Sequence, residues 1–155
     1  MPRNTNRNSS KNDVGLKAAS TEDILPANLH IDRMTPAQAL AAMLDNQAHA
    51  ITALKAALPA IERGAIAAYQ RLCQSENGRL IYVGAGTSAR IGVQDGAELL
   101  PTFNWPHHRV DFLIAGGASA LLRPVENAED EADTAAAKIT SMAVGPDDVV
   151  IGLAA

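Results

Sequence analysis

The stretch "GRLIYVGAGTSARIG", Gly78 to Gly92, decides the fold of this chain. The apolar run Leu80 to Val83 is typical of a short buried strand, and the glycine-rich turn from Gly84 to Ser88 predicts the start of a helix directly after it. A turn of this kind places backbone N–H groups at a helix N-terminus, where they bind anions such as phosphate. The ligand of the turn has to be inferred from its neighbours.

Two further strands follow the same pattern. Val110 to Ala115 is an apolar run that ends in Gly116-Gly117, and Asp148 to Ala154 is another. Between them, Glu129 to Met142 has acids in its first turn, which suits a helix dipole. The order strand, helix, strand, helix, strand predicts an α/β fold, a parallel sheet sandwiched between helices. Ligands of such sheets bind beyond the carboxyl ends of the strands, where both glycine turns lie.

Composition divides the chain into three parts. Residues 1–20 are rich in Asn, Ser, Lys and Arg and predict a disordered tail. Residues 21–76 predict a helical segment, and residues 77–155 the α/β domain. Because the chain stops inside the apolar run "DDVVIGLAA", we expect this domain to be incomplete at its C-terminus.

The helical segment has a clear start. Thr35 and Gln38 are spaced to cap each other, and Pro36 suits the first turn. Apolar residues then recur at helical spacing until Asn77-Gly78 ends the pattern. We expect Pro59 to begin a new helix rather than to lie inside one.

Charge and composition exclude several function classes. The net charge is −4 and no basic block stands out, which argues against a nucleic-acid surface. Cys73 is the only cysteine, so we expect no internal disulfide and a reducing, cytoplasmic location. No apolar run approaches the roughly 20 residues of a membrane span. We expect no metal site, because none of the four histidines has ligand partners at metal spacing: His30, His49, His107 and His108.

The glycine turn has three competing interpretations. The spacing Gly84-x-Gly86-x-x-Ala89 fits a loose dinucleotide pattern, but the second strand does not end in the acid that would hold a ribose, and Asp111 lies near that strand's beginning. A sugar phosphate needs only backbone N–H groups and hydroxyls at the turn. A tight strand-to-helix turn without a ligand also fits these residues. The phosphate-binding candidates are Gly84, Gly86, Thr87 and Ser88.

Several motifs in the same order resemble the N-acetylmuramic acid 6-phosphate etherases, a family with the sugar isomerase (SIS) fold. The resemblance covers about residues 20–155. It implies cleavage of the D-lactyl ether of the sugar, giving N-acetylglucosamine 6-phosphate and D-lactate, in the recycling of cell-wall amino sugars. It also implies a homodimer that needs no cofactor. The motifs are "STEDILPANLHIDRMTPAQAL", "GRLIYVGAGTSARIGVQDGAELLPTF", "IAGGASALLRPVENAED" and "DDVVIGLAA".

The resemblance implies two catalytic carboxylates. Glu98, in "GAELLPTF", and Glu129, in "VENAED", match the catalytic pair of the family. We expect Glu98 to protonate the leaving lactate and Glu129 to act as base, although the reverse assignment stays open. Taken without the resemblance, both also fit solvated acids near helix starts. Arg90 fits either a substrate contact or an exposed helix arginine.

Two other functions fit an SIS fold. A sugar-phosphate-binding regulator would keep the glycine turn but would need neither carboxylate. An aldose–ketose phosphate isomerase would use a proton at C2 but would need no group to protonate lactate. The etherases continue after the last motif with a Ser-Gly-x-Thr-Pro turn that completes their phosphate site. We therefore expect the 155-residue chain alone to be inactive and prone to aggregation.

Overall fold

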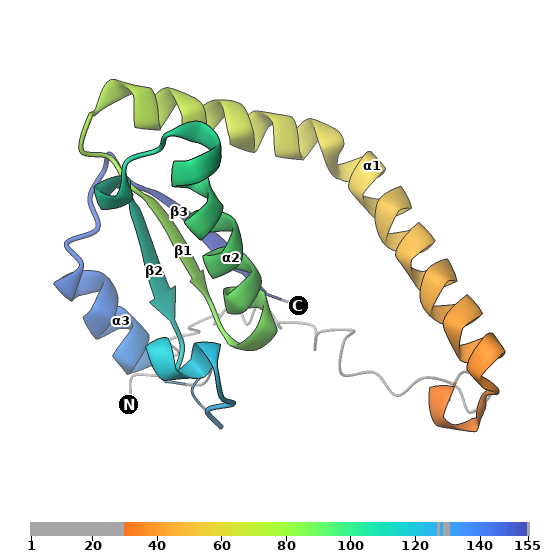
Figure 1. Ribbon diagram of the computed structural model, residues 1–155. Coiled ribbons are helices and arrows are strands. Elements are labelled where there is room, and N and C mark those ends of the chain that lie inside the picture. Colours follow the sequence, from red (N-terminus) through yellow and green to blue (C-terminus); the bar gives the residue numbers. More distant parts are fainter. Residues whose placement is uncertain (1–29, 127, 129–130, 155) are drawn as a thin grey trace, which may run out of the picture. The chain divides into compact units, whose positions relative to one another are not determined.

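The computed structural model describes residues 30–126, 128 and 131–154 of the chain (Figure 1). The tail predicted for residues 1–20 lies outside these residues. The chain divides into two compact units, Met1–Met43 and Leu44–Ala155. No helix in the part that the structure describes has both the length and the apolar character needed to cross a membrane.

The long helix α1 spans Pro36–Gln74. It begins as predicted: the Thr35 backbone N–H donates to Gln38 Oε1 over 2.9 Å, and the Gln38 backbone N–H donates to Thr35 Oγ1 over 3.4 Å. The expectation for Pro59 is wrong, because this residue lies inside α1. Proline removes one backbone hydrogen bond, and the strong helix formers on both sides, mainly Ala and Leu, carry the helix across that gap.

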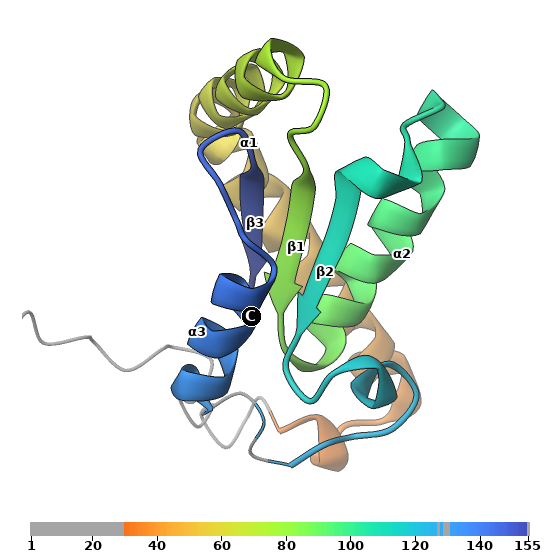
Figure 2. The same cartoon turned by 90° about the vertical axis from the view of Figure 1, so that its left-hand side faces the viewer.

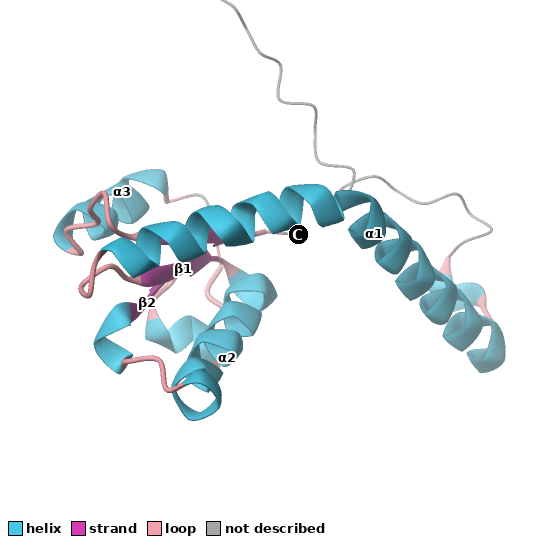
Figure 3. Cartoon of the chain, turned by 90° about the horizontal axis from the view of Figure 1, so that it is seen from above, coloured by secondary structure: helices cyan, strands magenta, loops and turns pink. Residues whose placement is uncertain are grey.

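The α/β domain contains a three-stranded parallel sheet, as predicted. Strands β1 (Leu80–Gly84), β2 (Val110–Ile114) and β3 (Val149–Leu153) lie in the order β2-β1-β3. Helix α2 (Gly86–Phe103) connects β1 to β2, and α3 (Ala132–Ser141) precedes β3. The two connections cross the sheet in opposite directions, so right-handed crossovers place α2 and α3 on opposite faces (Figures 2 and 3).

Helix α2 packs closely on the sheet through small residues. A Cβ on Gly96 would lie 2.6 Å from Phe112 Cε1 and 3.1 Å from Tyr82 Cε2. The Tyr82 and Phe112 rings stack beneath the helix with their centroids 5.8 Å apart. Gly92 and Ala89, which is 3% exposed, continue the same contact toward the start of α2. This stripe of small residues brings the N-terminus of α2 to the end of β1.

An ion-pair network holds the opposite, N-terminal edge of the sheet. The Arg79 guanidinium donates to both carboxylate oxygens of Asp148, over 3.2 and 2.8 Å, and lies 3.4 Å from Asp111. The Arg79 backbone N–H also donates to Asp148 Oδ1 over 2.8 Å. Since these residues belong to or directly precede the three strands, the network fixes the positions of the strands along the strand direction relative to one another.

Arg109 ties the end of α1 to the sheet. Its guanidinium donates to the carbonyl oxygens of Leu72, Ser75 and Gly78 over 2.7, 2.9 and 2.7 Å. The same guanidinium lies 4.4 Å from the centre of the Trp105 ring. A cation thus satisfies carbonyl groups at the C-terminus of α1, where the helix dipole favours positive charge.

The Asp148 carboxylate predicts a pH-dependent stability. Hydrogen bonds from Arg79, and then from the Gly145 and Arg79 backbones, lower the Asp148 pKa from 3.8 to about 2. The folded-state pKa is lower than the unfolded one, so the stabilisation is complete above pH 3.8 and disappears as the pH falls through about 2. We expect Asp148→Asn to lower the free energy of unfolding by about 2 kcal/mol at pH 6 and to flatten its pH dependence between 2 and 4. Urea unfolding at several pH values measures the free energy of unfolding of both proteins and its pH dependence.

The matched control is Asp147→Asn, which neutralises an exposed neighbour. Equal pH dependence in the two variants would contradict the assignment to Asp148.

The surroundings of Gly96 and Gly64 predict opposite effects when each is replaced by alanine. Gly96→Ala should destabilise the domain by about 1–3 kcal/mol, because its Cβ overlaps the Phe112 ring. Gly64→Ala, in α1, has no atom within 4 Å of the new Cβ and should stabilise by roughly 0.5–1 kcal/mol through helix propensity. Thermal and urea unfolding compare the two. Stabilisation by Gly96→Ala would show that α2 does not pack this closely.

Candidate functional site

The first glycine turn, which joins β1 to α2, leaves no space for a side chain at Gly84. A Cβ on Gly84 would lie 2.8 Å from the Leu153 carbonyl oxygen, so only glycine fits there. Gly86 has a φ of +53°, in the left-handed region that favours glycine. Ala85, the N-cap residue, has no side chain able to cap the helix, so the N–H groups in the first turn of α2 face a ligand or water.

Hydroxyl groups extend this turn. Thr87 is exposed and Ser88 is half-buried, both in the first turn of α2. No hydrogen bond joins either hydroxyl to another of the described residues. The backbone N–H groups and the two hydroxyls together offer several donors to one anion, which suits a phosphate monoester.

The second glycine turn follows β2. Gly116 and Gly117 have φ values of +76° and +72°, and a Cβ on Gly116 would lie 2.9 Å from Val125 Cβ. Arg90, in α2, donates from Nε and Nη2 to the Ala120 carbonyl oxygen over 3.1 and 3.0 Å. Arg90 therefore has a structural role, because it holds the segment after the second turn against α2. It is not a free surface arginine, and its guanidinium is not directed only at a ligand.

A cavity of about 280 Å³ lies between the two turns and α3. The carboxyl ends of all three strands form its floor, and one face of α3 forms its wall. Figure 2 shows α3 in front of the sheet. Its volume is close to the lower limit of typical ligand sites, about 300 Å³. The lining residues that bear on ligand binding are Gly84, Ala85, Gly116, Glu131, Thr134 and Lys138.

Three of these lining residues were missed by sequence reasoning. Glu131, Thr134 and Lys138 belong to a stretch that reads as an acidic helix start with a solvated face. Thr134 and Lys138 are four residues apart on one side of α3, and Glu131 is the N-cap residue three positions before Thr134. This periodicity is the signal that could have shown them.

The structure does not bring Glu98 to the glycine turn within one chain. Glu98 is exposed and lies in α2 twelve residues after Gly86, which corresponds to about 18 Å along the helix axis. Glu129 lies outside the described residues. Ala128 and Glu131, on either side of it in the sequence, both line the cavity.

The structure also bears on the other ligands considered. Asp111 lies at the N-terminal edge of the sheet, 3.4 Å from Arg79, so it is remote from any ribose at the glycine turn. In residues 30–126, 128 and 131–154, no three His, Cys, Asp or Glu side chains gather as a metal site would require.

Comparison with known proteins identifies the family. The family model described as the glucokinase regulatory protein N-terminal SIS domain matches residues 65–155. The chain belongs to this family. The parallel α/β fold around the glycine turn is therefore an SIS domain, as the sequence motifs predict.

Curated relatives confirm the resemblance to the etherases. Proteins named N-acetylmuramic acid 6-phosphate etherase from Deinococcus radiodurans and Cutibacterium acnes are 43% and 44% identical to 87% and 88% of this chain, which covers 44% of each. One from Pasteurella multocida is 39% identical over 90% of the chain and 46% of the relative. The chain thus spans about half the length of the curated relatives it matches.

Proposed function

We propose that this SIS domain is part of an N-acetylmuramic acid 6-phosphate etherase, a carbon–oxygen lyase. The observation that carries the proposal is the uncapped N-terminus of α2 beside a cavity at the strand ends, in a chain 39–44% identical to proteins of that name. The substrate is a sugar phosphate, and the proposed role is the recycling of cell-wall amino sugars. The cytoplasm is the proposed compartment, because the free thiol of Cys73 stays reduced there.

The phosphate group binds at the first glycine turn. Gly84 lets the turn approach β3, Gly86 supplies the left-handed conformation, and Thr87 and Ser88 supply hydroxyl donors. The dipole of the 18-residue helix α2 favours the negative charge.

The reaction is an elimination followed by hydration. In the open-chain sugar the C2–H bond is acidic, because it lies next to the C1 aldehyde. A base removes this proton, the C2=C3 double bond forms, and the C3–O bond breaks while an acid protonates the lactyl oxygen. Water then adds its hydroxyl to C3 and a proton to C2, which gives N-acetylglucosamine 6-phosphate. Carboxyl groups perform both proton transfers without a cofactor.

Glu98 and Glu129 are the proposed proton-transfer residues. Glu129 follows the second glycine turn in sequence, between two residues that line the cavity. Glu98 lies about 18 Å along α2 from the phosphate turn, too far to act on the same substrate. We therefore propose that Glu98 acts on the substrate bound to a second copy of the chain, within a homodimer.

Helix α1 offers a surface for such a dimer. From Leu44 to Leu72, apolar residues recur at alternating spacings of three and four, interrupted only by Gln47, the pattern of a coiled-coil seam. Five large side chains in this seam are between 48% and 71% exposed, so they lack a partner within the described residues. The seam positions are Leu44, Gln47, Ile51, Leu54, Leu58, Ile61, Ala65, Ala68 and Leu72.

A second candidate function is a sugar-phosphate-binding regulator without catalysis. The family model that matches is described as a domain of a regulatory protein, which favours this alternative. Binding of the sugar phosphate without release of lactate would support it.

The etherase proposal predicts lactate release. The complete product of the gene that encodes this chain, mixed with N-acetylmuramic acid 6-phosphate, should release D-lactate, measured with a lactate dehydrogenase assay. Glu98→Gln should lower kcat at least about 100-fold, because it removes a proton-transfer group. Glu76→Gln, an exposed glutamate just before β1, is the control and should have no effect. The 155-residue chain alone should be inactive, and lactate release by it that Glu98→Gln abolishes would overturn this expectation.

The dimer proposal predicts complementation between two inactive variants. Glu98→Gln leaves the phosphate turn intact, and Thr87→Glu leaves Glu98 intact but places a negative charge at the turn. Co-expressed variants should form mixed dimers with one complete site, which restores roughly a quarter of wild-type activity. Absence of any recovery in purified mixed dimers would show that Glu98 does not act across the interface.

A further inference from the structure

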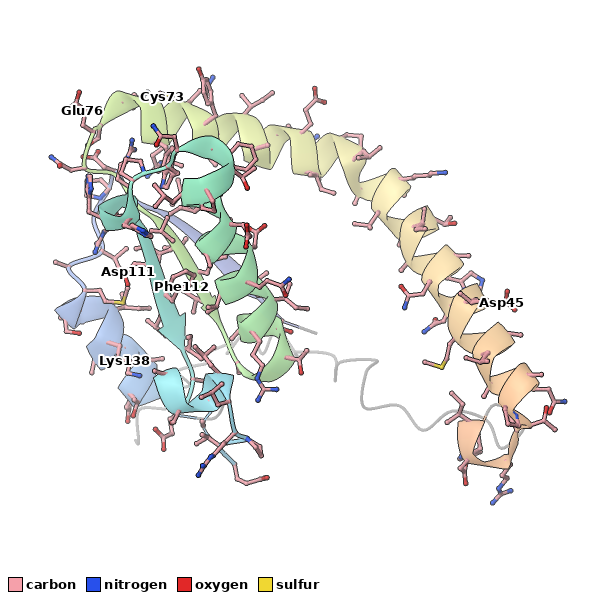
Figure 4. All side chains as sticks on the ribbon, viewed as in Figure 1. Asp45, Cys73, Glu76, Asp111, Phe112 and Lys138 are labelled. Carbon is pink, nitrogen blue, oxygen red and sulfur yellow. The ribbon has the colours of Figure 1, made fainter. Side chains whose placement is uncertain are left out.

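Lys138 lines two adjoining cavities, the one between the glycine turns and one of about 460 Å³ that Gly117 also lines. It lies on α3 (Figure 4). It is half-buried and lines the first cavity together with Gly84, Ala85 and Gly116. Its Nζ atom is 3.9 Å from the position that a Cβ on Gly117 would occupy. The ammonium group is therefore next to the second glycine turn, at the carboxyl end of β2.

The surroundings of Lys138 are mostly apolar. The cavity wall beside it includes Leu113, Ile114 and Ala135. Glu131 lines the same cavity but is the N-cap residue of α3, seven residues before Lys138, which corresponds to about 10 Å along the helix axis. Among the described residues no carboxylate lies within ion-pair distance of Lys138.

We propose that Lys138 binds an anionic group of the sugar ligand. The proposal rests on the proposed function and adds a residue that the resemblance does not imply. The first turn of α2 holds one anion with backbone dipoles and hydroxyl groups but contributes no full positive charge. The proposed substrate carries two anions, a phosphate and a lactyl carboxylate. A half-buried lysine beside apolar side chains attracts such a group more strongly than a fully exposed one, because part of its surroundings is protein rather than water.

The test is direct binding by isothermal titration calorimetry with the complete gene product. Three probes separate the anionic groups: N-acetylglucosamine 6-phosphate carries only the phosphate, N-acetylmuramic acid only the carboxylate, and N-acetylglucosamine neither. Lys138→Met removes the charge and keeps the length of the side chain, and Lys138→Arg keeps the charge. Arg63→Met, on the face of α1 opposite the seam, is the control for loss of one positive charge.

We expect Lys138→Met to weaken binding of at least one anionic probe about tenfold and to leave binding of N-acetylglucosamine unchanged. Lys138→Arg should retain most of the affinity, and Arg63→Met all of it. The probe that loses affinity identifies the group, phosphate or carboxylate, that Lys138 binds. Circular dichroism confirms that each variant is folded, and Lys138→Gln replaces Lys138→Met if that variant does not fold.

Two negative outcomes have different meanings. If the wild-type protein binds the anionic probes and Lys138→Met binds them equally well, the role of Lys138 is refuted and the proposed function stands. If the wild-type protein binds neither anionic probe, the proposed function fails and the inference on Lys138 fails with it.

Discussion

Helix α2 lies so close to the sheet that Gly96 has no room for a side chain over the stacked Tyr82 and Phe112 rings. This steric constraint sets the position of the rest of the site. It fixes the helix axis along β1, so the first turn of α2 opens at the carboxyl end of that strand. Backbone N–H groups are weak donors individually, and they bind an anion well only when they are held together in this way.

The elements that depend on local chemistry could be predicted from the sequence. The three strands, the start of α1 at Thr35 and the first glycine turn all follow from apolar runs, capping residues and glycines within a few positions of each other. The prediction for Pro59 is wrong, because a helix of 39 residues rich in Ala and Leu continues through a proline that costs about 3 kcal/mol in its interior. The sequence alone does not show whether a helix continues through a proline or begins again at it.

The candidate site was less predictable, since it depends on distances through space. Lys138 and Glu131 line the cavity because α3 begins at the carboxyl ends of the strands and runs along the face of the sheet, a property of the assembled fold. Glu98 shows the opposite case: the resemblance implies a catalytic role, but α2 separates Glu98 from the turn, because a helix rises about 1.5 Å per residue along its axis. Only the resemblance distinguished Glu98 and Glu129 as catalytic residues, because pattern and spacing alone fit solvated acids equally well.

The hydrogen bonds from Arg90 to the Ala120 carbonyl give the two glycine turns a common mechanical support. The N-terminus of α2 follows the first glycine turn. Arg90, four residues after Gly86 in the same helix, holds the segment that follows the second glycine turn. Because α2 supports both turns, a displacement of this helix would move the first glycine turn and the segment around Ala120 together.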